Sequence, residues 1–162
     1  MGRLKISDPF WQVVGLGTLA GMRSSSAPAI TSQILSHHHS IRLQRSNLKF
    51  MQSKTVANTL TLLSLGEVVA DKIPSIPNRI APASVSFRGL SGALAGASIY
   101  KARGGNAVVG AMIGASAAVA SSFISFYLRR GVVKRTKIID PLIGAIEDAL
   151  VAGAGIGLIQ LS

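Results

Sequence analysis

Long apolar stretches alternate with short polar stretches along this chain, and most of the polar stretches are basic. The longest stretch without a charge covers residues 107–128, which at about 1.5 Å per helical residue is enough to cross the hydrocarbon core of a bilayer. The other apolar stretches, which we predict to be helical, are 9–36, 55–71, 89–100 and 140–162. The pattern therefore predicts an all-α, polytopic membrane protein, a compact Gly- and Ala-rich bundle of about five apolar segments.

The first apolar stretch contains a break. Asp8 followed by Pro9 is a strong helix start, but Arg23, three serines and Pro28 interrupt the helical pattern. Residues 9–36 are therefore either one long kinked span or two half-helices that meet, as a re-entrant segment, at Arg23–Pro28. Non-helical backbone at this depth is tolerated only inside protein or against a water-filled cavity.

Membrane orientation depends on this break. With 9–36 as one span, the positive-inside rule favours a cytoplasmic N-terminus and an external C-terminus. With a re-entrant hairpin, the basic residues divide evenly between the two sides, and dual topology is possible.

Small residues recur at the spacing of helix contacts. Pairs of this kind allow the backbones of two helices to approach closely in a bilayer, within one chain or between subunits. We expect a homo-oligomer. The GxxxG pairs are Gly17/Gly21, Gly92/Gly96 and Gly110/Gly114.

Composition supports a membrane protein over a nucleic-acid-binding protein. Hydrophobic residues make up 48% of the chain, charged residues 14%, and the mean hydropathy is +0.44. The net charge of +11 comes from cations between apolar segments, where anionic lipid headgroups attract them; we predict no nucleic-acid partner. We expect residues 1–162 to form a single integral membrane domain with basic loops at 37–54 and 129–137.

Residue types restrict the possible chemistry. The chain has no Cys, which excludes disulfides, thiolate catalysis and Cys-ligated metals. His37, His38 and His39 are more typical of a solvated helix end than of a metal site, because no spaced carboxylate or Cys accompanies them. We predict no cofactor.

Ionisable and hydroxyl residues within or beside the apolar segments are the candidate binding residues. Such residues are functional-site candidates in a membrane protein, and they otherwise form structural ion pairs. Glu67 and Asp71 share one helix face, and the acids outnumber the arginines that could neutralise them, which favours a site for protons, a cation or water. No catalytic residue is assigned. The candidates are Arg23, Ser24, Ser25, Ser26, Glu67, Asp71, Arg88, Glu147 and Asp148.

Four motifs together resemble a family of proteins. They are GMRSSSAPA (21–29), GEVVADKIPSIPNRIAP (66–82), RGLSGALAGA (88–97) and DPLIGAIEDAL (140–150). This set resembles an uncharacterised bacterial integral-membrane family that is described only as a domain of unknown function. The resemblance implies a small polytopic protein of the bacterial cytoplasmic (inner) membrane. It implies no reaction and no substrate.

Three functions remain open at this point. The first is a small transporter or channel that moves a small ion or solute through a midplane site of acidic residues and a broken helix. The second is a membrane enzyme that acts on a phosphorylated lipid, with the arginine and serines binding phosphate. The third is a non-catalytic oligomer that organises the membrane through its GxxxG surfaces. The surplus of acids favours the first over the third, since packing alone does not need them. An enzyme is less favoured than a non-enzyme, because no His lies within an apolar segment and no Lys/Arg cluster gathers at the helix break.

Overall fold

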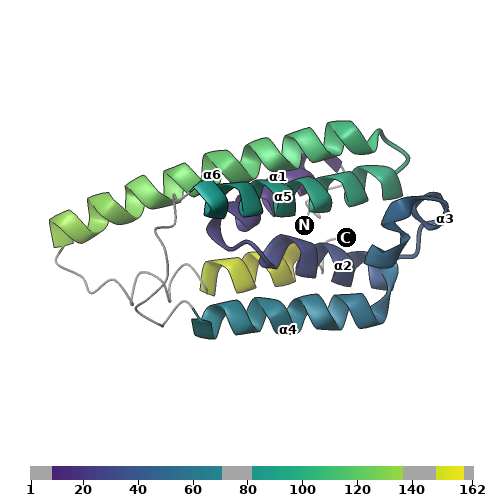
Figure 1. Cartoon of the computed structure of the whole chain (residues 1–162), viewed down its shortest axis with the longest axis horizontal. Coiled ribbons are helices and arrows are strands. Elements are labelled where there is room, and N and C mark those ends of the chain that lie inside the picture. Colours follow the sequence, from purple (N-terminus) through teal and green to yellow (C-terminus); the bar gives the residue numbers. More distant parts are fainter. Residues whose placement is uncertain (1–8, 71–81, 137–148, 159–162) are drawn as a thin grey trace, which may run out of the picture.

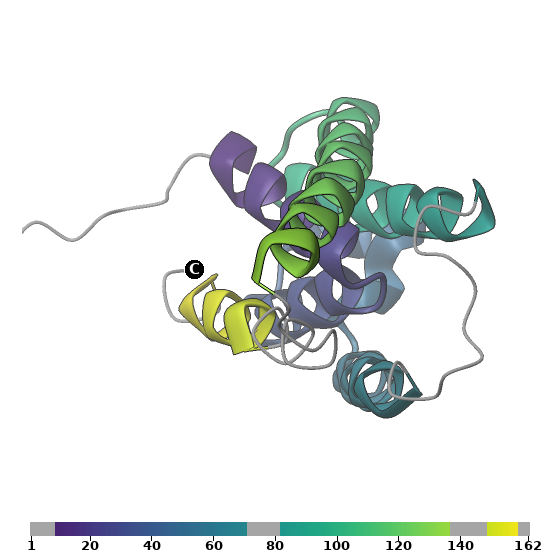
Figure 2. The ribbon, with the colours of Figure 1, turned by 90° about the vertical axis from the view of Figure 1, so that its left-hand side faces the viewer.

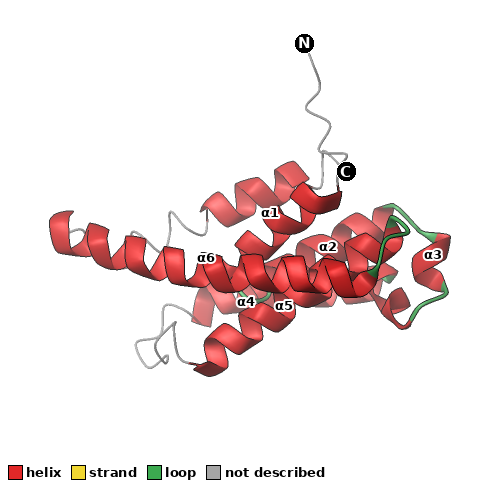
Figure 3. Cartoon of the chain, turned by 90° about the horizontal axis from the view of Figure 1, so that it is seen from above, coloured by secondary structure: helices red, strands yellow, loops and turns green. Residues whose placement is uncertain are grey.

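The computed structural model describes residues 9–70, 82–136 and 149–158, and every regular element in these residues is a helix (Figures 1 and 3). The predicted all-α class is confirmed. The helices are α1 (Pro9–Met22), α2 (Ser26–His37), α3 (Ile41–Gln44), the 3₁₀ helix η1 (Asn47–Gln52), α4 (Lys54–Ala70), α5 (Pro82–Ala102), α6 (Ala107–Thr136) and a C-terminal helical segment (Ala149–Leu158).

The long helices form two layers (Figures 1 and 2). In one layer α5 and α6 pack as an antiparallel pair, and α1 packs against both. In the other layer α2 packs against α4, and the C-terminal segment runs beside α2. The layers are joined mainly by α2 on α5 and by the turn between α1 and α2.

The chain reverses direction between α1 and α2, so the first apolar stretch is a hairpin of two half-helices. Near the start of α1, Gln12 accepts a hydrogen bond of 3.3 Å from the Arg103 side chain. Just after α2, Ser40 donates a hydrogen bond of 2.7 Å to the carbonyl oxygen of Ala102. Because Ala102 and Arg103 are neighbours, the start of α1 and the end of α2 lie at the same end of the molecule (Figure 1). The premise that favoured a cytoplasmic N-terminus, a single span over 9–36, therefore does not hold.

All six glycines of the predicted GxxxG pairs lie at helix contacts within the chain. A Cβ atom added at Gly96 would overlap the carbonyl oxygen of Gly110, and one added at Gly114 would overlap that of Gly92. On α1, a Cβ at Gly17 or Gly21 would overlap backbone oxygens of α6. Close approach of α1, α5 and α6 therefore requires glycine at these positions.

The two predicted basic loops contain regular structure. Residues 37–54 include α3 and η1, anchored by the fully buried side chains of Leu43 and Met51. Residues 129–136 continue α6, since arginine and lysine are good helix formers and nothing at Leu128 stops the helix.

Helix α5 begins earlier than the sequence indicated. It starts at Pro82 rather than at residue 89, because proline is compatible with the first turn of a helix. Among the described residues, one helix, α6, contains a stretch long and apolar enough to cross a bilayer, Ala107–Leu128. The finding suggests a membrane protein by length and composition alone.

Candidate functional site

The turn between α1 and α2 is stabilised from within. The Ser26 hydroxyl donates to the carbonyl oxygens of Leu19 (3.1 Å) and Arg23 (2.7 Å). The Arg23 amide closes the last turn of α1 on Leu19 at 2.8 Å. The Ser26 hydroxyl thus adds a second hydrogen bond to two carbonyl groups at the end of α1, and it faces the backbone rather than a ligand.

Glu67, near the end of α4, binds this turn with both carboxylate oxygens. One oxygen accepts from the amide (3.3 Å) and the hydroxyl (2.7 Å) of Ser24. The other accepts from the amide (3.0 Å) and the hydroxyl of Ser25. All four partners are donors, which is the set that an ionised carboxylate accepts.

Two further positive contributions meet the Glu67 carboxylate. The donors precede the first turn of α2, where the helix dipole is positive. Arg23, whose side chain is only 5% exposed, also attracts Glu67 electrostatically. A carboxylate in these apolar surroundings is therefore both hydrogen-bonded and charge-compensated.

Serines of α5 and α6 complete a polar layer at the level of the turn. Ser91 of α5 donates to the carbonyl oxygen of Ser24. From α6, Ser121 donates to Thr18 (2.8 Å) and Ser122 to Gly21 (3.1 Å), both at the carbonyl oxygens of α1. These serines were not predicted as site residues, although they occupy buried positions in helices otherwise built from Gly and Ala.

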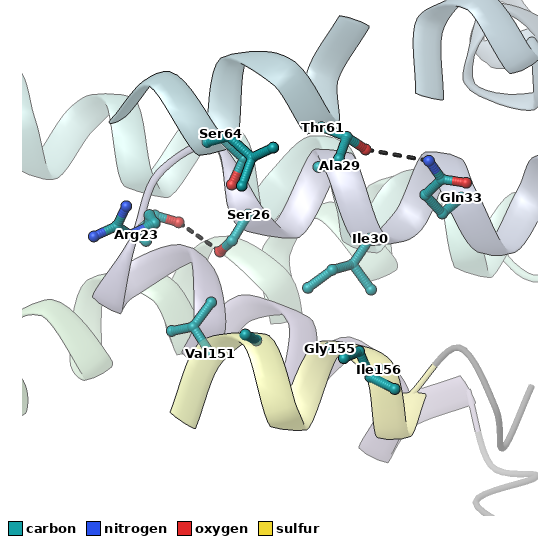
Figure 4. A pocket seen from close by; sticks show the side chains of 12 residues that line it. Arg23, Ser26, Ala29, Ile30, Gln33, Thr61, Ser64, Val151, Gly155 and Ile156 are labelled. Atoms are coloured by element: carbon teal, nitrogen blue, oxygen red, sulfur yellow. Dashed lines mark hydrogen bonds between the residues drawn. The ribbon is translucent and has the colours of Figure 1, made fainter. Parts of the chain in front are cut away.

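A cavity of about 370 Å³ lies directly beside the turn, between α2, α4 and the C-terminal segment (Figure 4). Gln33 and Thr61 both line it, and the side-chain amide of Gln33 donates a hydrogen bond to the Thr61 hydroxyl at 3.2 Å. Polar groups thus come from the turn, α2 and α4, and the C-terminal segment contributes an apolar wall. The lining residues are Arg23, Ser26, Ala29, Ile30, Gln33, Thr61, Ser64, Leu65, Val151, Ala152, Gly155 and Ile156.

The predicted site residues divide into three groups. Arg23, Ser24, Ser25 and Glu67 are brought together, as the hypothesis of a site at the broken helix requires. Ser26 supports the turn, and Arg88 is buried on α5 one helical turn from Ser91. Asp71, Glu147 and Asp148 lie outside the described residues.

The histidine triplet remains without a metal-ligand set in the part of the chain that is described. His37, His38 and His39 are exposed, and Nδ1 of His39 lies 3.3 Å from Oε1 of Gln52. No group of three or more His, Cys, Asp or Glu side chains gathers among residues 9–70, 82–136 and 149–158.

Comparison with known proteins identifies the family. A family model described as "Domain of unknown function (DUF4126)" matches residues 11–161. The chain belongs to this family. The match confirms the family resemblance expected from the sequence and covers every described residue except Pro9 and Phe10. A search of curated proteins and a search of solved structures each found no match.

Proposed function

We propose that this protein is a small integral protein of the bacterial inner membrane that moves a small ion or solute through the polar layer at the α1–α2 turn. The observation that carries the proposal is the docking of the Glu67 carboxylate on Ser24 and Ser25, directly beside the cavity that Arg23 and Ser26 line.

The outer surface supports placement in a bilayer. Large apolar side chains are exposed along α6 and α4, where a water-soluble protein would carry polar residues. Those on α6 include Val108, Met112, Ile124 and Leu128. On α4, Leu62, Leu63 and Leu65 are likewise exposed. In a bilayer, lipid chains would cover these apolar faces, so their exposure would carry no free-energy penalty from contact with water.

The length of the half-helices supports a re-entrant hairpin. Helix α1 has 14 residues and α2 has 12, which correspond to roughly 21 Å and 18 Å at 1.5 Å per residue. Neither crosses a hydrocarbon core of about 30 Å alone, so the turn would lie deep in the bilayer. Many transporters place their binding sites at such helix breaks, with helix N-termini directed at anionic groups.

The contact between Glu67 and the turn would depend on protonation, holding when the carboxylate is ionised and loosening when it is protonated. A proton on the carboxylate removes its charge and converts one acceptor oxygen into a donor, so the amides and hydroxyls of Ser24 and Ser25 lose hydrogen-bond acceptors. The amides and hydroxyls of the turn would then be available to a solute or to water from the adjacent cavity. Release of Glu67 would also loosen α4, because this contact ties the end of α4 to the turn.

The two alternatives receive less support. For an enzyme on phosphorylated lipids, the donors suited to a phosphate are already bound by Glu67. For a membrane organiser that works through GxxxG surfaces, the six glycines of those pairs are occupied by contacts within the chain. Homo-oligomerisation would have to use other faces.

Ion flux in proteoliposomes tests the proposal. Protons, alkali cations and common anions are screened with the wild type, with Glu67→Gln and with Thr59→Val. Thr59 is exposed on the same helix, and its hydroxyl donates within α4 to Thr55, so its removal leaves the turn intact. We expect flux in the wild type and in Thr59→Val, and at least about a tenfold loss in Glu67→Gln, because the amide cannot bind and release the proton that opens and closes the turn.

Two results would count against it. Equal flux in Glu67→Gln and the wild type would exclude Glu67 from the path. The absence of flux for every ion tested, with the protein folded by circular dichroism, would exclude simple ion conduction.

A further inference from the structure

Helix α3 lies beside the α5–α6 connection at one end of the molecule (Figures 1 and 3). A basic pocket lies between them, at the end opposite Glu67. Its volume is about 230 Å³. Two cations come from α3 and the residue after it, and one comes from the last turn of α5. The lining residues are Arg42, Arg45, Lys101, Gly104 and Gly105.

The pocket is held together by hydrogen bonds between segments distant in the sequence. Ser40, just before α3, donates to the carbonyl oxygen of Ala102 at 2.7 Å. Arg42 donates from Nη1 to the carbonyl oxygen of Arg103 at 3.2 Å. These bonds set the distance between α3 and the end of α5, and hence between the cations they carry.

Gly104 creates the space that Arg42 occupies. Its φ of 87° lies in the left-handed region that favours glycine. A Cβ atom at this position would overlap the guanidinium of Arg42. The connection therefore requires glycine both for its backbone and for the position of the arginine.

The charges of the pocket lack a counter-charge in the described part of the chain. Within the described residues, Arg42 donates one hydrogen bond to the Arg103 carbonyl oxygen, and the side chains of Arg45 and Lys101 donate none. The one acidic residue in the same part, Glu67, is bound to Ser24 and Ser25 at the far end. Three cations around one pocket repel each other, and an anion between them would remove this repulsion.

We propose that this pocket binds a phosphate group. Arginine matches the geometry of phosphate oxygens with paired N–H donors, and lysine adds a point charge, so the set suits a phosphate mono- or diester. The apolar stretch of α6 begins at Ala107, two residues after Gly105, which places the pocket at the level of lipid headgroups if α6 spans a bilayer. The phosphate can therefore belong to a lipid headgroup or to a soluble phosphate, and the site does not depend on the proposed transport.

The test measures binding of two probes to the full-length protein in a neutral detergent. Native mass spectrometry counts retained short-chain phosphatidylglycerol, with phosphatidylcholine as the zwitterionic comparison, and isothermal titration calorimetry measures inorganic phosphate. The test variant is Arg42→Gln/Lys101→Gln. The matched control, Lys49→Gln/Lys54→Gln, removes the same charge from exposed positions at the same end that do not line the pocket.

We expect one phosphatidylglycerol or phosphate per chain, and at least about a tenfold weaker affinity in the test variant than in the control, because charged hydrogen bonds are lost. Binding of the lipid alone identifies a headgroup site, and binding of both probes identifies a general phosphate site; either supports the proposal. Gly104→Ala keeps every charge but displaces Arg42, and we expect it to weaken binding as well. Equal losses in the test and control variants, or no binding of either probe to the wild type, would overturn the proposal.

Discussion

The two layers of this protein differ in what a Cβ atom added at a buried glycine would contact. In the layer of α1, α5 and α6, a Cβ at Gly96 or Gly114 would strike the backbone of the facing helix. In the layer of α2, α4 and the C-terminal segment, a Cβ at Gly155 would strike only the end of the Ile30 side chain, which borders the 370 Å³ cavity. Backbone cannot move without moving a whole helix, whereas a side chain beside a cavity can change its rotamer.

This difference assigns distinct roles to the layers. Backbone-to-backbone packing fixes α1, α5 and α6 relative to each other, and the serines of α5 and α6 tie the turn to this scaffold. The cavity leaves the other layer with room to rearrange. Glu67 connects the layers, since it belongs to α4 and binds the turn, so a movement of α4 away from the turn would have to break these hydrogen bonds.

The largest effect is expected for Gly96→Ala. The methyl group would overlap the carbonyl oxygen of Gly110, so α5 and α6 would have to separate. We expect a loss of about 3 kcal/mol in the free energy of unfolding, at the upper end of overpacking penalties. Reversible denaturation of the purified protein in detergent measures it.

The control for this variant is Gly66→Ala on α4. A Cβ at Gly66 meets nothing within 4 Å, so the same chemical change introduces no overlap. If both variants lost similar stability, close packing between α5 and α6 would not be the cause, and the contrast between the layers would fail.

Next in size is Glu67→Gln. The amide side chain offers one acceptor oxygen in place of two, so at least one amide–hydroxyl pair of the turn loses its partner. We expect a loss of about 2 kcal/mol, the typical cost of leaving hydrogen-bonding groups unsatisfied. Denaturation measures the loss, and faster hydrogen exchange at the Ser24 and Ser25 amides would place it at the turn. Unchanged exchange there would show that Glu67 does not hold the turn in solution.

Sequence reasoning reached part of this site because its signals are local. Arg23 with three serines and a proline marks a helix break, and a carboxylate in an apolar helix calls for donors, so their meeting could be predicted. The reversal at the break could not, because the same residues suit a kink and a turn equally well. The direction is set by tertiary bonds, such as that from Arg103 to Gln12 across the fold.

The cavity was beyond prediction for a similar reason. Gln33, Thr61 and Ser64 resemble ordinary polar positions in their own helices, and they become a wall only when α2, α4 and the C-terminal segment are placed together. The GxxxG pairs were predictable as contacts, but their spacing does not distinguish partners in the chain from partners in another subunit.

A smaller effect is expected for Gly155→Ala. The overlap with Ile30 is smaller than the overlap with the Gly110 oxygen at Gly96, Ile30 can turn into the cavity, and alanine favours the helix. We expect a change within about 1 kcal/mol by the same denaturation measurement. A loss as large as that of Gly96→Ala would mean that Ile30 is fixed and that the cavity wall is as rigid as the glycine-packed layer.

The smallest effect in this layer is a gain, expected for Gly153→Ala. This residue is exposed in the same helical segment as Gly155, and an added Cβ meets nothing within 4 Å. Alanine is better than glycine in a helix by up to about 1 kcal/mol, so we expect the free energy of unfolding to rise by about 0.5 kcal/mol. Subtracting this gain from the Gly155→Ala result isolates the cost of moving Ile30. If Gly153→Ala instead destabilised the protein, the C-terminal segment would be in contact with something at its exposed face, such as a second copy of the chain, and the tolerance of this layer would have to be measured again in the monomer.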